Sequence, residues 1–234
     1  ARAGGFSEVG LVGEPHGGNL LSYESFERSL LPALRGFGLY AFPALERAGH
    51  GFGVHGRVRL EVEPSGLEGV QWRKRGELVS GGAVVCLTEL RPELGERAAA
   101  VLAPALEARG IEGEVEVVEV SGREPGIHVT VWAEFEGGYG SGSAPGKRGV
   151  KVELVAEEAL KAFDEWFKSD ATLDTYLADQ VLLAAALADG PTFYSVPQVT
   201  RRLLTMAWVI KQFMPIPITI RGAEGSPGTV SIEK

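Results

Sequence analysis

Segments with helix-like and strand-like hydrophobic periodicity alternate along the whole chain, and this alternation limits the possible fold more than any other feature. Val58–Glu63 alternates strictly between apolar and charged residues, as a half-buried strand does. Residues 92–109 instead place apolar side chains three and four positions apart, which is typical of an amphipathic helix, and Gly110 follows as a stop signal. The alternation predicts an α+β fold.

The order of these segments suggests three regions, at residues 1–66, 67–170 and 171–234. The first contains a helix at 24–36 that Pro32 should kink or break. The middle region reads strand–helix–strand–strand–helix, which is enough for a small domain. In the C-terminal region, a pair of helices and a short strand precede two segments that could pair as a hairpin: helices at 173–188 and 200–214, a strand at 192–196, and the hairpin at 218–221 and 229–233.

Composition limits the cellular location and the kinds of partner that we expect for this chain. A single cysteine, Cys86, excludes an internal disulfide and suggests a reducing, cytoplasmic location. No apolar run approaches the roughly 18 residues of a membrane span, so we expect no membrane partner. The net charge of −8 argues against nonspecific coating of nucleic acid, since phosphate contacts require concentrated lysine and arginine. A small basic site remains compatible with it, and Lys147-Arg148 and Arg201-Arg202 are candidates.

The stretch from Gly137 to Gly149 contains many glycines and ends near Lys147 and Arg148. Exposed backbone N–H groups beside two cations could hold a phosphate. The stretch is not a Walker loop, because Gly-Lys is followed by Arg148 rather than serine or threonine. A flexible surface loop that leads into the next helix is the alternative.

The histidines and the cysteine predict no metal site. His16, His50, His55 and His128 stand far apart in the sequence, and no carboxylate or cysteine near them has ligand spacing. Cys86 lies in an apolar strand-like segment, which favours a small buried side chain over a nucleophile.

Tyr176, Asp179 and Gln180 fall on adjacent turns of one predicted helix and share a face. An aromatic ring on which a base can stack, next to a carboxylate and an amide, suits a nucleoside. A solvated polar face is the alternative.

Two motifs resemble those of RNA 3'-terminal phosphate cyclases. One is Thr172–Gln180, followed by an apolar run, Gly190 and residues 203–213; the other is Gly146–Gly149. Residues 10–63 resemble the family's second core repeat more weakly. The resemblance implies a core of repeated β-α-β-α-β-β units with a small inserted α+β domain. It also implies an ATP-dependent enzyme of RNA processing that adenylates a histidine and converts an RNA 3'-phosphate to a 2',3'-cyclic phosphate, with Tyr176 stacked on adenine and Asp179 and Gln180 beside the nucleotide.

This sequence departs from the family pattern in ways that predict impaired catalysis. Nothing corresponds to the glycine-rich opening segment and first repeat of the family, so we expect about a third of the core to be missing. The position of the nucleophilic histidine, just before Leu203, is Arg202. Arginine stays protonated and has no lone pair with which to attack phosphorus, but it can bind a phosphate. The resemblance thus implies ATP and magnesium only if the protein is active.

The departures leave several functions open. Lys147, Arg148 and Arg201 are candidates for contacts with phosphate or with an RNA 3' end, and one basic cleft that included Arg202 would favour this interpretation. A noncatalytic scaffold in RNA processing or ribosome assembly would fit the acidic composition. Enolpyruvyl transfer on a related repeat fold is less favoured, because its phosphate-binding residues have no clear positions here. Uncovered core edges would favour a homo-oligomer or a partner chain in place of the missing repeat.

Overall fold

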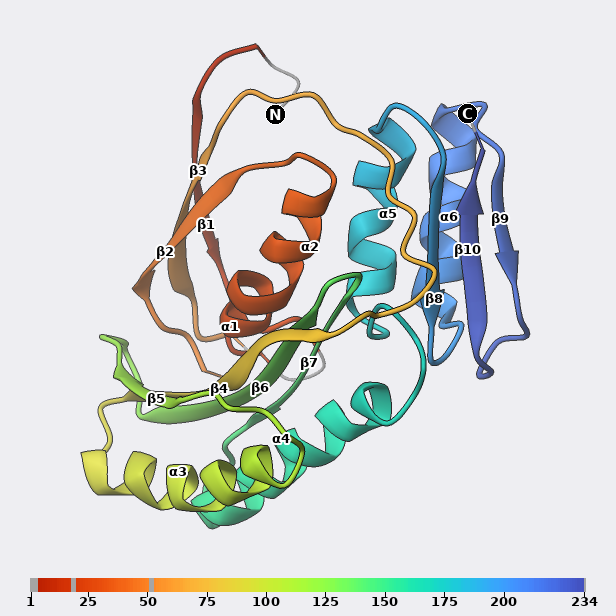
Figure 1. Ribbon diagram of the computed structural model, residues 1–234. Helices are drawn as coiled ribbons and strands as arrows, with labels where there is room; N and C mark the ends of the chain where they lie inside the picture. The colour runs from red at the N-terminus through yellow and green to blue at the C-terminus, as the bar shows by residue number, and fades with distance from the viewer. Residues whose placement is uncertain (1–3, 18–19, 51–52, 234) are drawn as a thin grey trace.

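The computed structural model describes residues 4–17, 20–50 and 53–233, and it is a mixed α+β protein with three sheets (Figure 1). The α+β class predicted from the sequence is therefore confirmed. No helix in these three ranges is both long and apolar enough to cross a bilayer.

The first and last sheets share one topology. The first contains β1 (Ser7–Gly13), β2 (Ala41–Arg47) and β3 (Gly56–Val62) in the antiparallel order β1-β3-β2. The last contains β8 (Thr192–Val196), β9 (Ile218–Arg221) and β10 (Gly228–Ile232) in the antiparallel order β8-β10-β9. In each sheet a helical segment joins the first two strands, and the third strand lies between them. The hairpin predicted at the end of the chain is confirmed as β9 and β10.

The helical segment between β1 and β2 changes its geometry where the sequence predicted a break. It begins as α1 (Tyr23–Ser25), continues as a π-helical turn, η1 (Phe26–Leu30), and ends as α2 (Leu31–Gly36). Pro32 lies in the first turn of α2 and has no N–H to donate to the preceding turn. The widened turn ends at Leu30, two residues before the proline, so the irregularity predicted at Pro32 is confirmed.

The middle sheet contains β4 (Leu78–Thr88), β5 (Val115–Glu119), β6 (Gly126–Phe135) and β7 (Gly138–Pro145) in the order β5-β4-β6-β7. Strand β4 runs parallel to β5, which α3 (Pro92–Glu107) connects to it, and antiparallel to β6. Helices α3 and α4 (Val152–Phe167) cover one face of this sheet (Figure 1). The opposite face packs against α1 and η1, so the middle of β6 is buried on both sides.

Strand β7 corrects the prediction of a glycine-rich loop. Most of Gly137–Gly149 pairs with β6, from His128 opposite Pro145 to Phe135 opposite Gly138. A Cβ at Gly142 would lie 2.0 Å from the backbone nitrogen of Phe163, and one at Gly140 would lie 2.3 Å from the Trp166 ring. The absence of side chains at these glycines lets α4 pack closely against the sheet. The glycines thus serve helix packing and do not form a flexible loop.

Two hydrophobic cores result from this arrangement. One lies between the middle sheet and its two helices, and it includes Phe163 and Trp166. The other gathers around α5 (Leu177–Leu187) and α6 (Arg201–Phe213) with β8 and β10. Leu67, Val70 and Trp72 join this second core, and their segment runs beside β8 through bridges at Glu68 and Gln71. The division of the chain at residues 66 and 170 stays a prediction.

Candidate functional site

Arg202 and the first turn of α5 form the most concentrated group of polar side chains around the predicted nucleotide motif. Arg202 is the second residue of α6, and its Nε donates to Asp179 Oδ1 at 3.3 Å. Its Nη2 donates to the carbonyl oxygen of Thr175 at 3.2 Å, and the guanidinium carbon lies 4.3 Å from the centre of the Tyr176 ring. Arg202 therefore lies in direct contact with the motif that the resemblance assigns to the nucleotide.

Asp179 is almost completely buried, and both of its oxygens have partners. Oδ1 accepts from Arg202, and Oδ2 accepts from Gln180 Nε2 at 3.0 Å. A cation at the N-terminal end of a helix is unfavourable because of the helix dipole. The Asp179 carboxylate offsets this effect at α6, and the Thr200 hydroxyl caps the same helix by accepting from the Leu203 N–H at 3.1 Å. Arg202 is thus fixed as the partner of Asp179, with 46% of its side chain still exposed.

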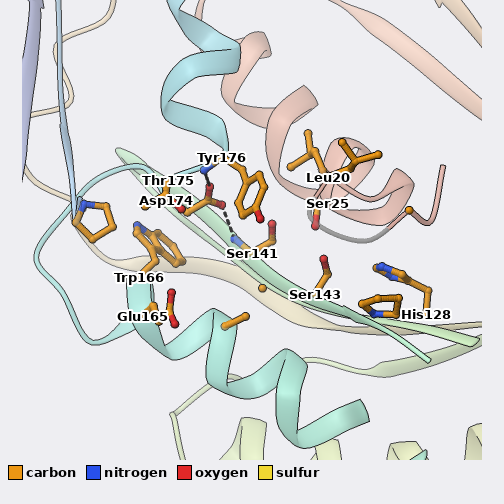
Figure 2. A pocket seen from close by; sticks show the side chains of 16 residues that line it. Leu20, Ser25, His128, Ser141, Ser143, Glu165, Trp166, Asp174, Thr175 and Tyr176 are labelled. Carbon is orange, nitrogen blue, oxygen red and sulfur yellow. Dashed lines mark hydrogen bonds between the residues drawn. The ribbon is translucent and has the colours of Figure 1, made fainter. Parts of the chain in front are cut away.

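A cavity of about 160 Å³ opens beside this group (Figure 2). Its walls come from the segment that precedes α5, from β6 and β7, from α4 and from the region around α1, and they include Tyr176, Asp174, Ser141, Trp166 and His128. Small-molecule pockets usually measure roughly 300–1,000 Å³. The cavity therefore has room for a base or a phosphate group rather than for a complete nucleoside triphosphate.

Asp174 holds the wall of this cavity together. Its Oδ1 accepts from the backbone N–H of Tyr176 at 2.7 Å, and its Oδ2 accepts from Ser141 N–H at 2.8 Å (Figure 2). Oδ1 also accepts from the Leu177 N–H at 2.8 Å. Burial raises the pKa of Asp174 to about 6, although the three N–H donors act in the opposite direction. The side chain thus joins β7 to the start of α5; it lies inside the motif Thr172–Gln180, but no role was predicted for it.

The predicted basic residues lie in two places. Lys147 and Arg148 are exposed in the turn between β7 and α4. Arg201 is also exposed, and its Nε lies 3.2 Å from Glu224 Oε1. None of the contacts described for this structure joins these residues to one another, so a single basic cleft stays a prediction.

Three of the four histidines meet inside the protein, although they are far apart in the sequence. The rings of His16 and His50 stack with their centres 4.6 Å apart, and the His128 ring lies 5.3 Å from that of His16. Glu24 Oε1 accepts from, or pairs with, His16 Nε2 at 2.8 Å. Cys86 is fully buried beside them, as expected for a small apolar side chain, whereas His55 is exposed. Sequence spacing could not reveal this cluster, since five different segments supply it.

Burial sets the charge of these groups. It lowers the pKa of His50 to about 4 and that of His128 to about 3, so both imidazoles are neutral at pH 7. Burial alone would raise the pKa of Glu24, but the hydrogen bond from His16 and the nearby imidazoles lower it overall. An ionised carboxylate therefore lies among imidazoles in the interior of the protein.

Comparison with known proteins identifies the family. The model of the family described as RNA 3'-terminal phosphate cyclase matches residues 1–220. The chain belongs to the RNA 3'-terminal phosphate cyclase family. It is 34% identical over 194 residues to the RNA 3'-terminal phosphate cyclase of Methanopyrus kandleri, a match that covers 80% of this chain and 55% of that protein.

Two further cyclases give the same result. The protein from Archaeoglobus fulgidus is 34% identical over 197 residues, which cover 84% of this chain and 58% of the relative. The protein from Methylococcus capsulatus is 32% identical over 234 residues, which cover 99% of this chain and 65% of the relative. The chain thus spans 55–65% of the length of these three cyclases.

Proposed function

We propose that this chain binds an RNA 3' end or a nucleotide beside Tyr176 and Arg202 and does not carry out the adenylation step of a cyclase. The names of its relatives supply the substrate class, an RNA that ends in a 3'-phosphate. A phosphate and a base are also what an arginine, a tyrosine ring and a small cavity suit best.

The observation that carries the proposal is the environment of Arg202. The resemblance places the nucleophilic histidine of the family at this position. Here a guanidinium donates to Asp179 and to the Thr175 carbonyl. A guanidinium stays protonated with a pKa above about 12 and has no lone pair to attack the α-phosphorus of ATP. Its fork of N–H donors can instead bind an anion from the exposed side.

The cavity supports binding of a fragment rather than catalysis on ATP. Its volume of about 160 Å³ suits a base or a phosphate group, and the position expected to form the covalent adduct lacks a nucleophile. The residues present therefore do not fit the adenylation chemistry implied for ATP and magnesium. The three oxygens of a terminal phosphate beside Arg202, with the adjoining base near Tyr176, fit the geometry better.

Two measurements on the full chain test this proposal. Incubation with labelled ATP and magnesium should give no acid-labile AMP adduct. The Arg202→His variant should restore little of this adduct, because a histidine at this position does not by itself place ATP for attack. Misplacing the reactants by about 1 Å can reduce the rate roughly a hundredfold.

Binding is measured with a fluorescent oligoribonucleotide that ends in a 3'-phosphate, and the complex should raise its anisotropy. The Arg202→Ala variant should weaken this binding about tenfold, as expected for the loss of one charge-assisted contact.

Lys211→Ala is the matched control, because Lys211 is an exposed cation in the last turn of the same helix and is not among the candidate RNA contacts. It should bind the oligonucleotide within about twofold of the unmodified chain. Robust adenylation of the unmodified chain would contradict the proposed loss of catalysis. Equal affinity of the Arg202→Ala variant and the unmodified chain would contradict the proposed binding site.

Exposed apolar residues favour a scaffold as the second candidate. On α6 the side chains of Trp208 and Phe213 are 63% and 83% exposed. Strand β1 pairs on one side with β3, and Leu11 and Val12 on it are exposed. Apolar side chains grouped on a helix and an edge strand are typical of a covered interface. A partner chain or a second copy that protects these residues from labelling in solution, without any RNA binding, would support the scaffold.

We also propose that the first and last sheets are two copies of one repeated unit. In its favour is the shared order of a strand, a helical segment and two further strands, with the last strand in the centre. On this view the middle sheet with α3 and α4, within the predicted range 67–170, is an insertion between the repeats. A fragment of residues 73–170 that gave a cooperative thermal transition by itself would support the insertion.

A further inference from the structure

The buried cluster of His16, His50 and Cys86 brings together segments that are distant in the sequence. His16 follows β1, His50 follows β2, and Cys86 lies in β4. The backbone positions the two imidazoles: residues 16 and 50 form a parallel bridge, and the His16 N–H donates to the Gly49 carbonyl at 3.2 Å. The three side chains are therefore fixed by β-structure rather than by a single flexible loop.

Each of the two imidazoles uses one nitrogen and leaves the other without a partner. His16 Nε2 lies 2.8 Å from Glu24 Oε1, and His50 Nε2 lies 2.9 Å from Thr88 Oγ1. The Nδ1 atoms of both rings are buried and have no hydrogen-bond partner within the described ranges. Buried polar atoms are nearly always satisfied, so two such atoms in one cluster require an explanation, and a bound ion is one.

The arrangement of hydrogen bonds is the one found around metal-ligating histidines. Such a histidine usually donates its second N–H to a carboxylate or another oxygen, which fixes the tautomer and aims the lone pair of the other nitrogen at the metal. Glu24 and Thr88 supply these oxygens here. With hydrogen on both Nε2 atoms, each buried Nδ1 carries a lone pair that no donor in the described ranges uses.

The thiol of Cys86 completes a set of three donors. One possible ligand atom from each of His16, His50 and Cys86 lies within 4.8 Å of the other two. Bonds of about 2.0–2.1 Å to nitrogen and 2.3 Å to sulfur would bring tetrahedral ligand atoms to roughly 3.4–3.6 Å from one another. The two rings stack within 14° of each other, and an imidazole lone pair lies in the plane of its ring. Metal binding therefore requires one ring to tilt about its Nε2 hydrogen bond, so that its Nδ1 turns toward the other two donors and the three ligand atoms draw closer.

We propose that His16, His50 and Cys86 bind a zinc ion, with Glu24 and Thr88 holding the two imidazoles in place. Two nitrogens and a sulfur select zinc-like borderline ions over magnesium or calcium, which prefer oxygen. Binding converts the Cys86 thiol to a thiolate and releases its proton to solvent. The ion links the segments after β1 and β2 to β4, and thus stabilises the contact between the first sheet and the middle sheet. This inference does not depend on the proposed RNA binding.

Metal titration of the whole chain tests the site. After removal of metal with a chelator, one equivalent of cobalt(II) should bind per chain and give a thiolate-to-cobalt charge-transfer band and the strong visible bands of tetrahedral cobalt. Zinc should displace cobalt and abolish these bands. Free zinc at a hundredfold excess over its Kd should raise the Tm by roughly 5–10 °C, whereas magnesium should leave it unchanged.

Three variants separate the site from adventitious binding. Cys86→Ser keeps the side-chain size and should lose the charge-transfer band, and His50→Asn should weaken zinc binding at least tenfold. His55→Asn is the matched control, because His55 is exposed on the segment that follows His50 and should bind like the unmodified chain. Circular dichroism of each variant reports whether it is folded, and the cobalt spectrum of the unmodified chain stands independently of the variants. Stoichiometry far below one, a tetrahedral spectrum without a thiolate band, or equal losses in His55→Asn would overturn the proposal.

Discussion

Replacing Gly142 with alanine introduces a Cβ atom where β7 meets α4. That atom would lie 2.0 Å from the Phe163 backbone nitrogen and 2.4 Å from the Phe163 Cα. Ordinary contact begins near 3.4 Å, so the strand and the helix must separate by about 1.4 Å at this point. The obstacle is the helix backbone, which cannot rotate away as a flexible side chain can.

The expected loss in the free energy of unfolding follows from the side-chain packing that this separation disturbs. Overpacking of a well-packed core typically costs about 1–3 kcal/mol. Phe163 and Trp166, both buried against the same strand, would lose contacts as α4 moves. We therefore expect a loss of about 3 kcal/mol in the free energy of unfolding. For a chain of this size, this corresponds to a Tm lower by roughly 6–12 °C.

Thermal and urea unfolding, followed by circular dichroism, measure the effect. Gly10→Ala is the control, because a Cβ at Gly10 in β1 meets no atom within 4 Å; its Tm should be equal to or slightly above that of the unmodified chain. If Gly142→Ala and Gly10→Ala had the same Tm, the close approach of α4 to β7 would be refuted. The glycine-rich segment would then regain its interpretation as an open loop.

Three further predictions concern polar groups in and near the C-terminal helices. The pKa of Asp174 in the folded protein is about 6, against a usual 3.8, so the protonated carboxyl stabilises the fold below pH 4 and this stabilisation is lost as the pH rises through 6. The free energy of unfolding of the unmodified chain should therefore fall by about 3 kcal/mol over this range, and that of Asp174→Asn should not. Parallel pH profiles of the two proteins would contradict the assignment. Thr200→Ala removes the cap of α6 and should cost about 1 kcal/mol in urea unfolding, while Thr200→Ser should cost much less. Tyr194→Phe leaves the buried Ala178 carbonyl without the donor now at 2.7 Å, and should lower the free energy of unfolding by about 1–2 kcal/mol; an unchanged midpoint in urea would refute this.

Much of the secondary structure could be predicted because hydrophobic periodicity is a local property. The helices at α3, α4 and α6 and the hairpin of β9 and β10 follow from the spacing of apolar residues. Strands β1 and β2 were missed. Pro43 within β2 and the exposure of most side chains along β1 weaken the alternation that marks a half-buried strand.

The candidate site was only partly predictable. The resemblance to the family placed Arg202 beside the Tyr176 and Asp179 motif, and the observed contacts agree with this proximity. Asp174 was not predicted, because a lone aspartate in the sequence gives no sign that a distant strand will supply the Ser141 N–H as its donor.

The sequence by itself determined the α+β class, most of the helices and the absence of a histidine at position 202. Only the tertiary structure decided what the glycines of β7 and the scattered histidines do. A glycine is indistinguishable in sequence whether it loosens a turn or makes room for a helix, and only the position of α4 separates the two cases. His16, His50 and Cys86 become neighbours only when β1, β2 and β4 are brought together, because contacts between side chains depend on distances in space that sequence spacing does not encode.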